Sequence, residues 1–168
     1  MRYKINWKKI EESVKDFGYS SEEVKKRSII MFASGFVPNG SSGAITEIEE
    51  KEWHHYLKLK EIRPKINGKY LFFSEFKEEL EKIAINELEK GEFLHAKINT
   101  DAYKAGKDYV LCLYYPDDSK KTELATKYKN NKKVAYRFWK SDNSTRQKIY
   151  SEEYLNNLSF KERKNIKS

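Results

Sequence analysis

A histidine and a lysine two positions apart, His95 and Lys97, are the first residues in this chain that could do chemistry. In residues 93–100 apolar and polar residues alternate, which predicts a strand whose apolar side chains lie on one face. His95, Lys97 and Asn99 then share the other face. Burying an isolated ammonium group is costly, so a lysine in mid-strand must reach solvent or an anion. We predict that Lys97 contacts a phosphate-bearing ligand; the alternative is a surface lysine whose charge simply reaches water.

A second set of polar side chains follows a strand closer to the C-terminus. Residues 133–140 are rich in aromatic and β-branched residues and predict a strand, and residues 141–145 predict a polar loop. Arginine can bind phosphate with two parallel hydrogen bonds, and a hydroxyl adds a further donor. The alternative is an ordinary basic loop. The candidates for binding phosphate here are Arg137, Lys140, Thr145, Arg146 and Tyr150.

The net charge of +8 belongs entirely to the second half of the chain. Residues 94–168 contain 17 Lys and Arg against 9 Asp and Glu, whereas residues 1–93 contain 17 of each kind. This asymmetry favours a polyanionic partner such as RNA, a nucleotide or a phosphopeptide, with a lysine-rich solvated surface as the alternative. The lysines that would supply nonspecific attraction to phosphates are Lys120, Lys121, Lys127, Lys129, Lys132 and Lys133.

Several classes of site and location are excluded or disfavoured by residue type. The single cysteine, Cys112, excludes an internal disulfide and a cysteine-based zinc site. His54 and His55 are adjacent, so on a helix they would diverge and could not readily share a metal ion. No nucleotide-binding glycine motif or zinc-protease motif is present, and we expect neither a metal nor a cofactor. No stretch approaches the roughly 18 apolar residues of a membrane helix, so we expect a cytoplasmic protein that does not bind membranes.

Two helices are predicted in residues 1–36, which we interpret as an N-terminal helical arm. The first has apolar residues at helical spacing and ends at Gly18. The second begins after Ser20, where Glu23 completes a capping box, and ends at Gly35.

Residues 37–43 contain proline, glycine and serine and predict a linker, with a mobile loop over a site as the alternative. Residues 45–59 carry apolar residues at roughly helical spacing and predict a third helix. Pro64 excludes helix for the residue before it.

The rest of the chain predicts the order strand, helix, strand, strand, helix, strand. This order indicates an α+β domain, residues 44–150, with helices packed on one face of a sheet. A ferredoxin-like sandwich fits the order, and so does a larger curved sheet built on the same repeat. Residues 151–168 predict a short helix and a basic tail. The strands are predicted at 69–73, 93–100, 109–115 and 133–140, and the helices at 74–90 and 119–130, the first of them capped by Ser74 and ended by Gly91.

Five phrases in residues 53–150 together resemble one protein group. They are E-I-R-P (61–64), G-K-Y-L-F-F (68–73), A-K-I-N-T (96–100), V-L-C-L-Y-Y-P-D-D (110–118) and W-K-S-D-N-S-T-R-Q-K-I-Y (139–150). In this order and spacing they are similar to those of uncharacterised proteins with an eIF4E-like fold that carry the label of a phosphothreonine lyase domain. The resemblance implies a curved, mostly antiparallel sheet with helices on one face, here preceded by the N-terminal helices.

Two kinds of activity are implied by this resemblance. Proteins with an eIF4E-like fold stack the cap guanine on aromatic rings, which makes Trp53, Tyr136 and Trp139 candidates for stacking a base. A phosphothreonine lyase needs a base to remove the Cα proton and an acid to help phosphate leave. On this hypothesis Lys97 would be the base and a protonated His95 the acid.

Two residues depart from the pattern of the group. Lys148 stands where a glycine is expected, and Asn99 stands where a serine is expected. If the glycine is needed for close approach of the backbone to a ligand, the site of this chain differs from that of the group.

The leading hypothesis is a protein that binds RNA or a nucleotide on the polar face of its sheet. Lys97, Lys140 and Arg146 would position the ligand phosphate. The first alternative is a lyase acting on phosphoprotein, and the second is a small interaction or inhibitor protein. The residues do not decide between binding and catalysis, and they do not indicate an oligomeric state.

Overall fold

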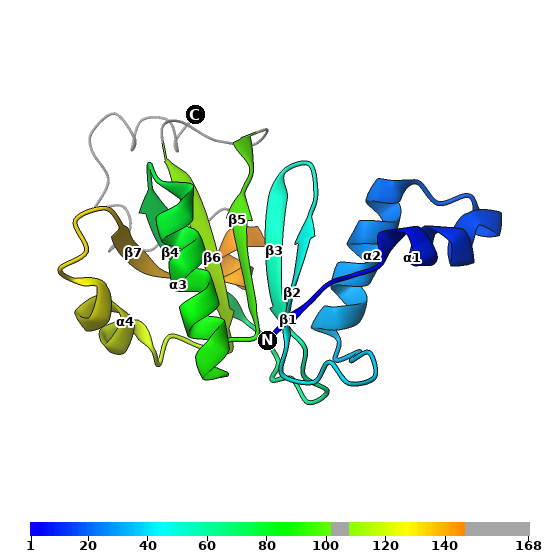
Figure 1. The fold of residues 1–168 in the computed structure, drawn as a ribbon. Helices are drawn as coiled ribbons and strands as arrows, with labels where there is room; N and C mark the ends of the chain where they lie inside the picture. The colour runs from blue at the N-terminus through cyan, green and yellow to red at the C-terminus, as the bar shows by residue number, and fades with distance from the viewer. Residues whose placement is uncertain (102–107, 147–168) are drawn as a thin grey trace.

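The computed structural model describes residues 1–101 and 108–146 and contains one open, seven-stranded sheet (Figure 1). The strand order is β1-β2-β3-β5-β6-β4-β7; β1 is parallel to β2 and every other neighbouring pair is antiparallel. The predicted α+β class with a mostly antiparallel sheet is therefore confirmed. The strands are β1 (Arg2–Tyr3), β2 (Ile45–Glu49), β3 (Trp53–Lys58), β4 (Gly68–Ser74), β5 (His95–Asn99), β6 (Tyr109–Tyr115) and β7 (Ala135–Ser141). The helices are α1 (Trp7–Val14), α2 (Ser21–Ala33), α3 (Lys77–Lys90), α4 (Lys121–Tyr128) and α5 (Asp142–Arg146).

The four strands β4 to β7 and the helices α3 and α4 form the predicted repeat. β4 and β5 run parallel with β6 between them, and β6 and β7 run parallel with β4 between them. Each β-α-β unit is thus split by a strand of the other, as in ferredoxin-like domains. Beyond β5 the sheet continues through β3, β2 and β1, so the fold is the larger sheet built on this repeat.

Helices α3 and α4 cover one face of the sheet and close the main core. On α3, Leu80, Ala84 and Leu88 follow the helical period and are fully buried. Gly91 ends the helix with φ of 84°, as predicted. The start differs: α3 begins at Lys77, because the Ser74 hydroxyl accepts the Phe76 N–H at 3.0 Å and caps the turn before the helix.

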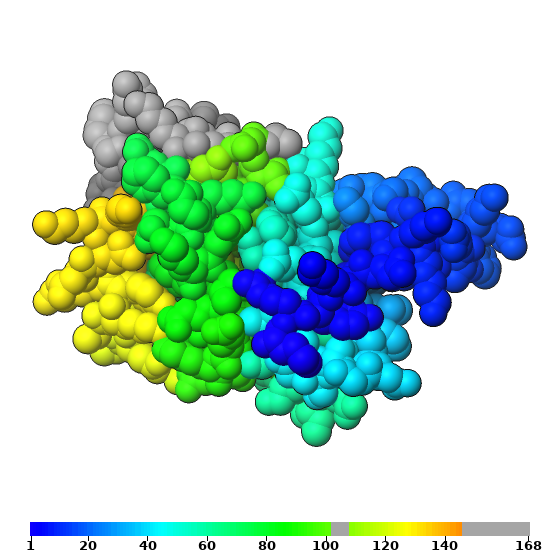
Figure 2. Space-filling model, viewed as in Figure 1, coloured from blue at the N-terminus to red at the C-terminus, as the bar shows by residue number. Residues whose placement is uncertain are grey.

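The N-terminal helices form as predicted and project from the β2–β3 end of the sheet as a separate lobe (Figures 1 and 2). Ser20 and Glu23 make the full capping box at the start of α2. Ile29 and Phe32 of α2 pack on Ile48, Leu57 and Leu59, on the side of the sheet opposite α3. This end of the sheet therefore carries a helix on each face. None of the described helices is long and apolar enough to cross a bilayer.

Residues 45–59 are not a helix but the hairpin of β2 and β3, so that prediction is wrong. Their apolar residues lie on both faces of the hairpin: Ile45 and Tyr56 belong to the main core, whereas Ile48 and Leu57 pack under α2. A hairpin that is buried on both faces has no simple alternation, so its apolar residues can be mistaken for a helical pattern. Pairing of β3 with β5 then favours the strand over the isolated helix, because local propensity is a weak influence beside tertiary packing.

The predicted polar loop at residues 141–145 is also corrected. β7 runs to Ser141, and the short helix α5 follows at once. The Ser141 hydroxyl accepts the Ser144 N–H at 3.0 Å, as a helix N-cap does. Short hydroxyl and amide side chains favour both turns and N-caps, which is why the sequence alone did not separate the two.

Candidate functional site

The sheet face opposite α3 carries the polar side chains, and we call the part formed by β3, β5, β6, β4 and β7 the polar face. Successive residues of a strand point to opposite faces, so these strands place every second residue in the main core and the others on the polar face. The residues of the polar face that bear polar or aromatic groups are Trp53 and His55 on β3, His95, Lys97 and Asn99 on β5, Cys112 and Tyr114 on β6, Lys69 and Phe73 on β4, and Phe138 and Lys140 on β7. Leu71, Cys112 and Phe138 form a small apolar cluster among them.

The strand register arranges these side chains in two adjacent rows. In the first row His55 is opposite Lys97, which is opposite Cys112. In the second row Tyr114 is opposite Lys69, and Lys69 is opposite Lys140. Like charges directly opposite each other destabilise a sheet, so Lys69 beside Lys140 is not a pair that folding alone favours.

Lys97 lies at the centre of the polar face, as the sequence predicts. Its Nζ is 3.9 Å from the centroid of the Trp53 ring and 5.9 Å from that of Tyr114. Burial lowers the pKa of Lys97, and the positive charge of Lys69 lowers it further. The aromatic faces stabilise the ammonium only in part, so Lys97 is a cation that an anion would stabilise.

Lys69 and Lys140 form the second cationic part of the face. Lys69 Nζ is 3.5 Å from Asp142 Oδ1 and 5.6 Å from the Tyr114 ring centroid. Burial lowers the pKa of Lys140, again with a contribution from Lys69. Asp142 therefore forms an ion pair with Lys69, while the polar face carries three lysines: Lys69, Lys97 and Lys140.

Two histidines stand in contact beside Lys97. His55 Nδ1 and His95 Nε2 are 3.0 Å apart, and the tautomers decide which nitrogen donates. Glu50 Oε2 is 3.4 Å from His55 Nε2, and the His95 ring stacks on Tyr114 with centroids 4.6 Å apart. Burial lowers the pKa of His55 to about 4 and that of His95 well below its usual value. Both rings are therefore neutral at pH 7.

The remaining predicted phosphate contacts are not brought into these rows. Arg137 is exposed and is the extra residue of a bulge in β7, with no partner in register on β4. Thr145 is exposed on α5, and its hydroxyl donates to the Ser141 carbonyl at 3.0 Å. Arg146 is the last residue of α5, and Tyr150 lies outside the described residues.

Two of the three predicted stacking residues lie on the other face of the sheet. Tyr136 and Trp139 pack against the main core beneath α3 and α4. A Cβ on Gly68 would lie 2.4 Å from the Trp139 ring, so the missing side chain of Gly68 makes room for this packing. Tyr136 and Trp139 therefore cannot stack on a base bound beside Lys97, and Trp53 is the predicted stacking residue that shares its face.

The two departures from the sequence pattern have different outcomes. Asn99 is buried, and its Oδ1 accepts the Val110 N–H at 2.7 Å, joining the end of β5 to the start of β6. Its role visible here is structural. Lys148 lies outside the described residues.

Three residues of the polar face, Lys69, His55 and Tyr114, were missed from the sequence, as was Glu50, which lies beside His55. His55 was missed because residues 45–59 were predicted as a helix. In a strand His54 and His55 point to opposite faces, so His55 alone lies beside Lys97. Lys69 begins the strand predicted at 69–73, whose other residues are apolar. Alternation of K-Y-L-F-F, with lysine and leucine on one face, is the signal that could have placed it.

Neither a metal site in the described residues nor a known relative indicates the function of this site. No group of three or more histidine, cysteine or acidic side chains in residues 1–101 and 108–146 is placed to hold a metal ion. Comparison of the chain with known protein families, with curated proteins and with solved structures finds no match. The resemblance to proteins with an eIF4E-like fold stays a prediction.

Proposed function

We propose that the polar face binds a phosphate-bearing ligand, RNA or a nucleotide. The observation that carries this proposal is the convergence of Lys69, Lys97 and Lys140 on one face, with Lys69 directly opposite Lys140. A phosphate group would relieve the repulsion and the cost of desolvation together.

The aromatic and uncharged groups on the same face support a nucleotide over a bare anion. Trp53 and Tyr114 flank the lysines and are only partly buried. Aromatic rings beside a basic groove are the usual means of holding single-stranded nucleic acid. The neutral His55–His95 pair lies beside Lys97 and adds polar, uncharged rings to this part of the face.

The test is a titration of fluorescein-labelled single-stranded RNA, followed by anisotropy, with a nucleoside triphosphate as competitor. We expect Lys97→Gln and Lys69→Gln each to weaken binding about tenfold or more, since a hydrogen bond to a charged group contributes roughly 1.5–3 kcal/mol. Binding should also weaken steeply with salt.

The matched control is Lys82→Gln, which removes the same charge from α3 on the opposite side of the sheet, where the side chain is 70% exposed. We expect Lys82→Gln to change affinity less than twofold. Equal losses in Lys82→Gln and Lys97→Gln would show that total charge, rather than the polar face, holds the ligand. Failure of the wild-type chain to bind either ligand at low salt would overturn the proposal.

A second candidate is the β-elimination of phosphate from phosphothreonine, which one observation favours. Lys97 has a lowered pKa, which favours a role as the base that removes the Cα proton. It lies two residues from His95 on the same face of β5. The lowered pKa of His95 weighs against its role as the acid. A phosphothreonine peptide incubated with the protein would lose the mass of phosphoric acid if this reaction occurs, and would keep its mass if the face only binds phosphate.

A further inference from the structure

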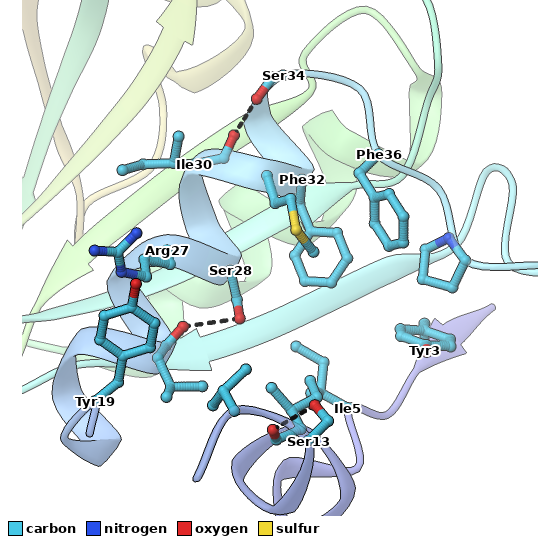
Figure 3. Close-up of a pocket in the computed structure, with 15 residues that line it drawn as sticks. Tyr3, Ile5, Ser13, Tyr19, Arg27, Ser28, Ile30, Phe32, Ser34 and Phe36 are labelled. Carbon is cyan, nitrogen blue, oxygen red and sulfur yellow. Dashed lines mark hydrogen bonds between the residues drawn. The ribbon is translucent and has the colours of Figure 1, made fainter. Parts of the chain in front are cut away.

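The N-terminal lobe contains an apolar hollow that the proposed function does not use. It has a volume of about 730 Å³ and lies between α1, α2, β1 and the segment that follows α2 (Figure 3). Ile10, Ile30, Met31 and Phe36 are among its lining residues. At one end Arg27 stacks on Tyr19, with 4.2 Å from the guanidinium carbon to the ring centroid. Tyr3 and Phe36 lie at the other end (Figure 3).

The serine hydroxyl groups in the hollow are already satisfied. Ser13, Ser28 and Ser34 line it, and each donates to a backbone carbonyl of its own helix, as the dashed lines in Figure 3 show. Arg27 is the charged residue among the fifteen that line the hollow. The surface therefore offers apolar contacts inside and positive charge at its edge.

Exposed apolar side chains are concentrated around this hollow. Of the eight large hydrophobic residues that stand exposed in the described chain, six lie in residues 1–36. Ile30 is 67% exposed, Phe36 49% and Met31 45%, although all three line the hollow. Sites for small molecules bury most of the ligand, so a hollow with walls this open fits a macromolecular partner better. Apolar groups of this size rarely gather on a surface without a partner.

The shape and length of the hollow fit a helix. The lining residues of α2 run from Val24 to Ser34, which corresponds to about 15 Å of helix. An amphipathic helix of similar length would place its residues i, i+3 or i+4, and i+7 into such a hollow. A bilayer presents a flat apolar surface and would contact the rim alone.

The charge of the lobe indicates which kind of helix. Residues 1–36 contain eight Lys and Arg against five Asp and Glu, a net charge of +3. Glu11, Glu12 and Glu23 already contact Ser21, Lys8 and Ser20 within the lobe. In the described chain no ion pair within 4 Å joins a carboxylate to Lys4, Lys9, Lys26 or Arg27. The pKa of Glu23 is lowered by its hydrogen bonds with Ser20 and also by the charges of Arg27 and Lys26. A second copy of the lobe would bring the same excess of positive charge and is disfavoured.

We propose that this hollow is a docking site for an amphipathic helix of a partner protein, with apolar anchors on one face and acidic residues beside them. Ile30, Met31 and Phe36 contact the anchors, and Arg27 with the neighbouring lysines contacts the carboxylates. The site is separate from the polar face and does not depend on the ligand proposed there.

The test is a display library of amphipathic 16-residue helices that samples apolar register and the charge of the polar face. Selection is carried out on the full-length wild-type chain, and affinities of the recovered peptides are measured by anisotropy. We expect acidic helices to be enriched, and we expect Ile30→Glu and Met31→Glu each to weaken their binding at least tenfold. Both side chains are exposed, so the variants should fold.

The matched control is Ile62→Glu, which changes an apolar residue that is 84% exposed outside the lobe. Its affinity should equal that of the wild type. Recovery of no helix, of basic helices, or of peptides that bind Ile30→Glu as well as the wild type would overturn the proposal. Two further results would also overturn it: co-sedimentation with anionic phosphatidylglycerol vesicles without any peptide binding, and a concentration-dependent dimer that Ile30→Glu abolishes.

Discussion

The two faces of the sheet are made by alternate residues of the same strands, yet they differ in almost every physical respect. Beneath α3, Tyr70, Phe72, Ile98 and Leu111 are fully buried in one continuous core. On the polar face the same strands carry His55, Lys97 and Lys140, whose pKa values are lowered by burial. One face is a continuous apolar core, whereas the other places three lysines on neighbouring strands, with Asp142 and aromatic rings beside them.

This difference separates stability from binding. Residues of the main core gain free energy from burial, so their loss must weaken the fold. The lysines of the polar face are retained despite a cost of desolvation, as is common for residues that serve a ligand. Substitutions confined to one face at a time therefore test whether stability and binding are independent.

The largest effect is expected from Leu80→Ala, in the face covered by α3. Leu80 is fully buried, and the cavity left by its side chain should lower the free energy of unfolding by about 2–5 kcal/mol. Urea denaturation followed by circular dichroism measures this loss. RNA binding by the folded variant should match that of the wild type, and a parallel loss of both would mean that the faces are not independent.

A smaller effect is expected from pH, through the histidine pair. The pKa of His55 is about 4 in the folded chain against an ordinary 6.5, and that of His95 is also lowered. Between these values the unfolded chain binds more protons, so stability should fall as pH drops through this range, by about 2 kcal/mol from pH 7 to pH 5 for His55. In His55→Gln the decline measured by thermal melts should be shallower. Equal slopes in the variant and the wild type would contradict a neutral buried His55.

The smallest effect is expected from Lys97→Met. Replacing a partly desolvated cation by an apolar side chain of similar length should leave the free energy of unfolding unchanged or raise it by about 1 kcal/mol. The same variant should lose binding of RNA and nucleotide. A loss of stability would instead assign Lys97 a structural role through its contact with Trp53.

Much of the fold could be predicted from the sequence where a pattern had one physical explanation. The capping box of Ser20 and Glu23, and the left-handed position at Gly91, marked helix ends that the structure confirms. The alternation around Lys97 placed β5 and its polar side correctly. Each of these signals is local and needs no knowledge of the rest of the chain.

The candidate site was harder to predict from the sequence, because it depends on pairing between strands that are distant in the chain. Lys69 and Lys140 are 71 positions apart and meet only through the register of β4 and β7. A bulge in β7 leaves Arg137 without a partner in register on β4 and turns Tyr136 toward the main core, and no local pattern in the sequence indicates it. The contact between His55 and His95 required β3 to be a strand, which the helical spacing of 45–59 concealed.

Strand β1, although two residues long, fixes the start of the N-terminal lobe to the sheet. Because Arg2 and Tyr3 pair with Ile45 and Thr46, residues 4–44 are a loop closed at both ends rather than a free tail. Closing a loop of this length costs conformational entropy, and the pairing of β1 with β2 offsets that cost for both α1 and α2. Removal of the first three residues should open the loop while the sheet stays folded, so limited proteolysis should then cut α1 and α2 first.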